Sequence, residues 1–122
     1  MKFLGPLDAR AYSLMRIVVG FLFACHGART LFGVLGGRAD IHNPLHLAAG
    51  LIEFGGGILI LLGLFTRFAA FIASGEMAVA YFMVHASRGL FPIMNGGELA
   101  VLYCFIFLYI ASRGTVGWGI QR

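Results

Sequence analysis

The sequence predicts an all-α integral membrane protein, a single four-helix transmembrane bundle built from two pseudo-repeated helical hairpins. Of the 122 residues, 60% are hydrophobic and 11% are charged, and the mean hydropathy is +0.90, whereas soluble domains carry roughly 25% charged residues. A helix needs about 20 apolar residues to cross a bilayer, so this length allows four crossings within one domain, 1–122. The motif H-x-x-R-x-L-F also occurs twice, beginning at His26 and at His85.

Four apolar stretches are separated by segments that favour loops. Residues 33–44 are rich in polar side chains and include adjacent glycines, a tight turn lies at Phe65 and Thr66, and the third connection contains Pro92. Glycine, proline and polar clusters are typical of loops, and short connections make neighbouring helices antiparallel. The expected transmembrane helices cover residues 11–32, 45–64, 67–87 and 96–112.

The basic residues indicate the orientation of the bundle. They are scattered singly and form no stripe, so the formal charge of +4 favours a topology signal over nucleic-acid binding. Cytoplasmic loops carry an excess of Lys and Arg. Six basic residues fall on one side of the predicted bundle, namely Lys2, Arg10, Arg16, Arg67, Arg113 and Arg122. Three fall on the other side, namely Arg29, Arg38 and Arg88. We therefore expect a multi-pass protein with both termini in the cytoplasm.

The repeated motif favours an internal duplication. Each copy closes a predicted helix and is followed by a loop and a second helix that carries a glutamate, Glu53 or Glu98. Two helices per unit is an even number, so the two halves would share one orientation and be related by an axis along the membrane normal.

Ionisable groups inside these apolar stretches predict a buried polar site. An ionisable residue at the centre of a membrane helix costs about 2.5–3.5 kcal/mol on insertion scales and usually faces the bundle interior. Histidine and arginine three positions apart share a helix face, and each copy of the motif has that spacing. The predicted cluster, in the outer half of the bundle, comprises Glu53, Glu76, Glu98, His26, His85, Arg29 and Arg88.

The cluster has a structural and a functional interpretation. In the first, Glu53 and Glu98 pair with Arg29 and Arg88 and fix the helix register; in the second, the acids and histidines handle protons. A carboxylate metal site would need Glu-x-x-His pairs on facing helices, and the sequence has none, so no metal is expected. Cys25 and Cys104 stand singly and form no redox motif. No residue is assigned a catalytic role.

Glycines flank each glutamate and predict close helix crossings or a slot for a flat ligand. Glycines at 55–57, at 75 and at 96–97 lie beside Glu53, Glu76 and Glu98, and small residues let membrane helices approach closely. The residues expected to line a ligand cavity are Phe54, Gly56, Phe71 and Tyr81.

The depth of each acid predicts its protonation state. Glu76 lies near the middle of its stretch, and no basic residue lies within two turns of it. Desolvation disfavours the ionised form of a carboxyl group, and a nearby cation favours it. We expect Glu76 to be protonated at neutral pH, and Glu53 and Glu98 to be ionised and paired.

Several of these segments together resemble the DoxX family of small bacterial membrane proteins. The resemblance extends from about residue 10 to residue 113 and includes residues 49–57, the segment 76–82 with His85, and residues 95–100. It implies a four-helix protein of the bacterial inner membrane. Relatives include a subunit linked to thiosulfate:quinone oxidoreduction and proteins tied to oxidative-stress complexes. The resemblance implies no cofactor-binding residues that can be transferred to this chain.

Three functions fit these observations. The chain is a redox-linked subunit that holds a quinone-like ligand, a proton-coupled carrier or permeation protein with Glu76 at its midplane, or a non-catalytic assembly partner. Its small size and lack of a cofactor motif favour support of a partner's chemistry over an independent reaction. Besides lipid, we expect a partner protein or a second copy of the chain.

Overall fold

Four long helices form the described part of the chain. The computed structural model describes residues 7–37, 42–92 and 96–120. No strand occurs in these three ranges. The helices are α1 (Asp8–Phe32), α2 (Pro44–Leu62), α3 (Thr66–Ala80) and α5 (Glu98–Arg113). The helix α3 continues into a π-helical turn, η2 (Tyr81–His85), and a short 3-10 turn, η3 (Ala86–Arg88). The prediction of an all-helical chain with four main helices is confirmed.

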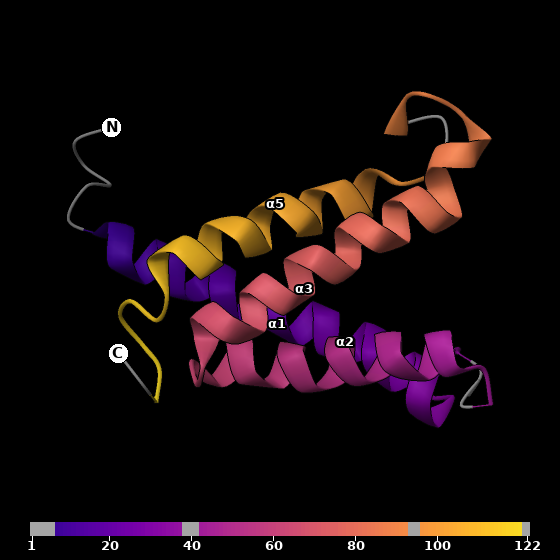
Figure 1. Cartoon of the computed structure of the whole chain (residues 1–122). Coiled ribbons are helices and arrows are strands. Elements are labelled where there is room, and N and C mark those ends of the chain that lie inside the picture. Colours follow the sequence, from indigo (N-terminus) through magenta and orange to yellow (C-terminus); the bar gives the residue numbers. More distant parts are fainter. Residues whose placement is uncertain (1–6, 38–41, 93–95, 121–122) are drawn as a thin grey trace.

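The helices pack as two hairpins, α1 with α2 and α3 with α5 (Figure 1). We call the end where α1 begins and α5 ends the tail end, and the opposite end the loop end. The hairpins converge at the tail end and diverge at the loop end (Figure 1).

The buried face of each helix follows the helical period. On α1 the buried side chains recur every three or four residues, as Tyr12, Arg16, Val19 and Phe23 do, which is the stripe that a core-facing helix presents. Three rings join the two hairpins: the centroid of Phe23 lies 4.6 Å from that of Phe107 and 5.5 Å from that of Tyr103.

Glycines set the crossing of α1 and α2, but of those expected on α2 only Gly57 does so, together with Gly20 on α1. A Cβ atom on Gly57 would lie 2.5 Å from the nitrogen of Ala24, and one on Gly20 would lie 2.7 Å from the nitrogen of Leu61. By contrast, no atom lies within 4 Å of a Cβ built on Gly55, Gly56 or Gly75. The expectation of a close crossing at every glutamate is therefore wrong for these glycines, because helix register decides which glycine faces a neighbouring backbone.

The residues after α5 fold across the tail end. The Tyr12 hydroxyl donates to the carbonyl of Gly114 at 2.8 Å, and the Ser13 hydroxyl donates to that of Val116 at 2.8 Å. The backbone N–H of Ile120 donates to the carbonyl of Leu62 at 2.9 Å. These bonds link the tail to α1 and α2 and close this end of the bundle.

Arg16 lies beneath this tail and not at the surface, where its role as a topology signal would place it. It is 0% exposed, and its guanidinium donates to the carbonyls of Ile60 and Leu61 at the end of α2. The last carbonyls of a helix lack partners within the helix and attract cations, which explains this burial.

The observed helix bounds refine the predicted ones. Helix α1 begins three residues earlier than expected, and α5 begins at Glu98 because Gly96 has a φ of +78° and cannot continue a right-handed helix. The third helix leaves the α conformation after Ala80. By length and apolar composition, two helices of the described residues, α1 and α2, could cross a membrane.

Candidate functional site

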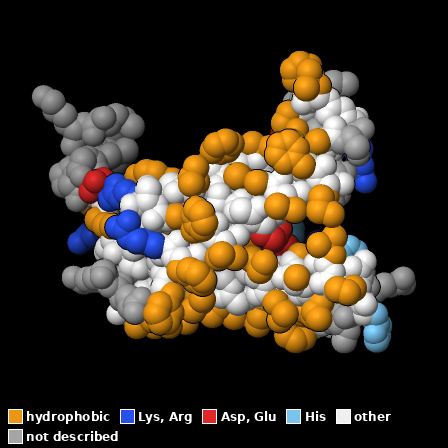
Figure 2. Space-filling view, in the orientation of Figure 1, with side chains coloured by type: hydrophobic (Ala, Val, Ile, Leu, Met, Phe, Trp, Pro, Cys, Tyr) orange, Lys and Arg blue, Asp and Glu red, His pale blue; other side chains and the backbone are white. Residues whose placement is uncertain are grey.

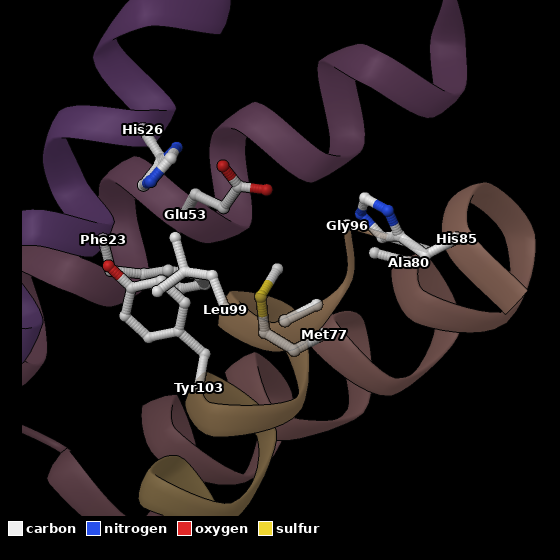
Figure 3. Close-up of a pocket in the computed structure, with 10 residues that line it drawn as sticks. Phe23, His26, Glu53, Met77, Ala80, His85, Gly96, Leu99 and Tyr103 are labelled. Carbon is white, nitrogen blue, oxygen red and sulfur yellow. The ribbon is translucent and has the colours of Figure 1, made fainter. Parts of the chain in front are cut away.

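The divergence of the two hairpins leaves a cavity of about 280 Å³ towards the loop end. Every helix contributes to its lining. His26 projects from α1, Glu53 from α2 and His85 from η2, and the Glu53 carboxyl lies between the two imidazole rings (Figure 3). We call this space the histidine cavity.

Apolar and aromatic side chains complete the histidine cavity. Phe23, Met77, Leu99 and Tyr103 line it, and the ring of Tyr103 lies edge-on to His26, with centroids 6.1 Å apart. Apolar walls with a few convergent polar groups are typical of small-molecule sites.

Glu53 and Glu76 form a hydrogen-bonded carboxyl pair between α2 and α3. Two carboxylates repel each other, so a hydrogen bond between them requires one proton, donated by one carboxyl group to the other. The second oxygen of Glu76, Oε1, is buried and accepts no hydrogen bond from the described residues. A proton on one of the two carboxyl groups would satisfy this contact, and Oε1 of Glu76 remains an acceptor without a partner among the described residues.

A groove of about 410 Å³ lies on the other side of this pair, between α2 and α3. Its walls are largely apolar and include Leu45, Ile52, Ile72 and Val79, and Glu76 lines it from α3. Ala80 lines both the groove and the histidine cavity. We call this space the α2–α3 groove. The carboxyl pair thus sits where the two spaces adjoin.

The π-helical turn carries His85 to the histidine cavity. A π turn inserts an extra residue into a helix and often occurs at functional sites. Here it spans Tyr81–His85 and packs against the start of α5, where a Cβ atom on Gly97 would lie 2.6 Å from the ring of Tyr81 and 2.9 Å from Cβ of His85. Gly97 is therefore needed for this close approach.

Only part of the predicted polar cluster comes together. His26, His85, Glu53 and Glu76 meet around the two spaces, and Arg29 adjoins His26 in a smaller cavity of about 230 Å³ at the loop end. Arg88 and Glu98 are exposed and line none of these three cavities. Within the described ranges, no ion pair joins Glu53 to Arg29; Glu53 bonds to Glu76 instead.

None of the four residues expected to line a ligand cavity lines the histidine cavity or the α2–α3 groove. Phe71 is 64% exposed, and Phe54 packs edge-on against Phe32 with ring centroids 5.3 Å apart. Neither Gly56 nor Tyr81 lines the histidine cavity or the α2–α3 groove. Tyr103, which does line the histidine cavity, was not predicted, although it is a polar-tipped aromatic residue in an apolar stretch.

The polar residues that line the histidine cavity, His26, Glu53, His85 and Tyr103, are acid–base and hydrogen-bonding groups. In the described ranges, no group of three or more His, Cys, Asp or Glu is placed to hold a metal ion. Cys25 and Cys104 are free thiols. What the arrangement can do by itself is hold a proton beside a pocket and orient a polar ligand there.

Comparison with known proteins establishes the family. The model of the DoxX family matches residues 11–86. An uncharacterized protein of Haemophilus influenzae is 49% identical over 110 residues, which cover 84% of this chain and 82% of the relative. No solved structure matches the chain. On the family match and this identity, the chain belongs to the DoxX family.

Proposed function

We propose that this protein is a membrane-embedded subunit that binds a quinone-like ligand in the histidine cavity and supplies protons to redox chemistry performed with a partner protein. The observation that carries the proposal is the placement of the Glu53–Glu76 carboxyl pair between a polar cavity and an apolar groove.

The surface of the bundle supports placement in a membrane. Large apolar side chains are exposed along the helices, among them Phe68 at 70%, Phe82 at 72% and Phe105 at 64%, and hydrophobic groups cover much of the face shown in Figure 2. Soluble monomers rarely expose apolar patches larger than a few hundred Å². We place the protein in the bacterial inner membrane as a single four-crossing domain, with the tail end towards the cytoplasm because most basic residues lie there.

The chemistry of a quinone matches the polar groups of the cavity. Its ring is flat and apolar, and its two carbonyl oxygens accept hydrogen bonds. Reduction to the quinol adds two electrons and two protons, with one proton on each oxygen. The carboxyl pair and the imidazoles of His26 and His85 would donate those protons, since imidazole titrates near neutral pH. The electrons would come from an electron-donating partner protein.

The closed tail end favours a binding site over a permeation path. Both spaces beside the carboxyl pair lie away from the tail, whereas Arg16 and the bonds of Tyr12 and Ser13 fill the tail end. A carrier would need a second conformation that opens this end. For that reason the proton-coupled carrier ranks below the ligand-binding subunit. A purely structural assembly partner ranks third, because it gives the two spaces beside the carboxyl pair no role.

Binding of decylubiquinone to the purified protein in lipid nanodiscs tests the proposal. A ligand that binds the folded state raises its thermal stability, so the unfolding midpoint should rise saturably with ligand concentration. We expect Glu53→Gln to weaken this binding about tenfold, which corresponds to roughly 1.4 kcal/mol. The same substitution at the exposed Glu98 is the matched control and should leave binding unchanged. Absence of saturable binding, or equal effects at both glutamates, would overturn the proposal.

A further inference from the structure

We infer that the ligand enters the site from the lipid phase through the α2–α3 groove and carries an apolar chain that occupies this groove while its polar head meets the carboxyl pair. The inference rests on the proposed function and adds a ligand class, a membrane-dissolved molecule with a head and a long chain, and a route of entry.

The position of the groove gives the first argument. Leu45, Val79 and Met83 line it and are 53%, 54% and 58% exposed, so the groove opens on the lateral surface of the bundle. Figure 2 shows acidic side-chain atoms amid hydrophobic side chains on this face, beside a hollow at the loop end. A group that reaches the carboxyl pair by this path passes walls that are apolar apart from His46 and Glu76 itself.

The volumes of the two spaces give the second argument. The histidine cavity, at about 280 Å³, lies just below the range of about 300–1,000 Å³ typical of ligand pockets. It suits a ring-sized head and leaves no space for a long chain. The adjoining groove of about 410 Å³ has the apolar walls that a hydrocarbon chain requires.

The free oxygen of Glu76 gives the third argument. Oε1 is buried, lacks a partner among the described residues and belongs to a residue that lines the groove. A buried acceptor without a partner is unfavourable, and a hydroxyl group of the quinol, the reduced form of the ligand, would satisfy it at the inner end of the groove. Lipid chains alone carry no such donor, which favours a ligand with a polar head over a bilayer lipid chain.

Small residues keep the groove open. Ala48, Ala49 and Gly75 form part of its walls, and no atom lies within 4 Å of a Cβ built on Gly75. Gly55 on α2 is equally free of neighbours but does not line the groove. These two glycines form a matched pair, because a Cβ atom meets no neighbour at either position and only one of them adjoins the groove.

The test compares two probes on three variants in nanodiscs. The probes are decylubiquinone and its analogue in which a methyl group replaces the decyl chain; the variants are Gly75→Leu, Ala48→Leu, which fills the groove from the opposite wall, and the control Gly55→Leu. We expect Gly75→Leu and Ala48→Leu to weaken binding of decylubiquinone about tenfold or more. Binding of the short analogue should change less than twofold, and Gly55→Leu should affect neither probe.

The outcomes separate the two proposals. If the wild type binds both probes, and the groove-filling variants bind decylubiquinone as tightly as Gly55→Leu does, the lateral route is overturned and the proposed function stands. Equal weakening of both probes by the groove variants would also overturn the route, since it would indicate distortion of the head site. If the wild type binds neither probe, the proposed function falls and the route falls with it.

Discussion

At the scale of single residues, the shared proton of the carboxyl pair makes a spectroscopic prediction. Glu76→Gln should remove a protonated-carboxyl stretching band at pH 7 while changing the free energy of unfolding by less than about 1 kcal/mol, because the glutamine amide still donates one hydrogen bond to the Glu53 carboxylate. Infrared difference spectra of the wild type and the variant measure this band. Glu98→Gln is the control, because Glu98 is exposed, and it should leave the band intact. Persistence of the band in Glu76→Gln would contradict protonation of Glu76.

Arg16 provides a second prediction at this scale. Its guanidinium donates to the last carbonyls of α2, so Arg16→Met should lower the free energy of unfolding by about 1.5–3 kcal/mol, the range for hydrogen bonds that involve a charged group. Reversible unfolding in mixed micelles measures the loss. Arg10 lies on the same helix and is exposed, so Arg10→Met should stay within about 0.5 kcal/mol of the wild type. Equal losses in the two variants would refute the capping role.

Some site residues could be predicted from the sequence, and others could not. Glu53, Glu76, His26 and His85 are conspicuous because an ionisable group in an apolar stretch requires a reason. The pairing of Glu53 with Glu76 depends on the register of α2 against α3, which neither stretch encodes by itself. The sequence also does not predict that Phe23 and Tyr103 line the cavity, because a helix that is apolar on all sides gives no indication of which face lines a cavity.

At the scale of elements, the crossing of α1 and α2 depends on single glycines. Gly57→Ala places a methyl group 2.5–2.8 Å from backbone atoms of α1, and such overpacking typically costs about 1–3 kcal/mol. Gly56→Ala is the adjacent control. With no atom near its Cβ, it should be neutral or stabilise by about 0.5–1 kcal/mol, since alanine favours helix over glycine. Thermal unfolding measures the stability of both variants, and equal stabilities would contradict the close crossing described for Gly57.

The helix bounds also separate what the local sequence predicts from what depends on tertiary contacts. Loop residues predicted the number of helices, because glycine, proline and polar clusters act locally. The change of α3 into a π turn after Ala80 was not predicted, because residues 81–85 carry no breaker. Its conformation is coupled to packing against Gly97 on the far side of a loop, and a tertiary contact of this kind leaves no periodic pattern in the sequence.

At the scale of the whole molecule, the start of α1 and the end of α5 lie at the same end of the bundle, and this placement predicts a labelling pattern. In a background with Cys25→Ala and Cys104→Ala, a membrane-impermeant maleimide added to intact cells should label Val34→Cys at the loop end. Trp118→Cys at the tail end should react only after permeabilisation. Both positions are about half exposed, so access to the reagent decides the result. The opposite pattern would invert the proposed orientation, and labelling of both from outside would contradict an even number of crossings.

The internal duplication inferred from the repeated motif remains a prediction, but the structure shows where the two copies place their histidines. His26 and His85, the first residues of the two copies, reach one cavity from the two different hairpins. Each hairpin therefore contributes one imidazole, and the site needs both halves of the chain to be complete.

The tail across the closed end has a consequence for biogenesis. Ser13 bonds to backbone atoms 103 and 105 positions later in the chain, at Val116 and Trp118. These partners leave the ribosome about 100 residues after Ser13, so α1 is synthesised well before they are available. Until then the face of α1 that carries Arg16 lacks its cover, and a chain truncated before Val116 keeps that face uncovered. Synthesis of residues 116–118 would thus distinguish chains that can cover this face from truncated chains that a protease should remove.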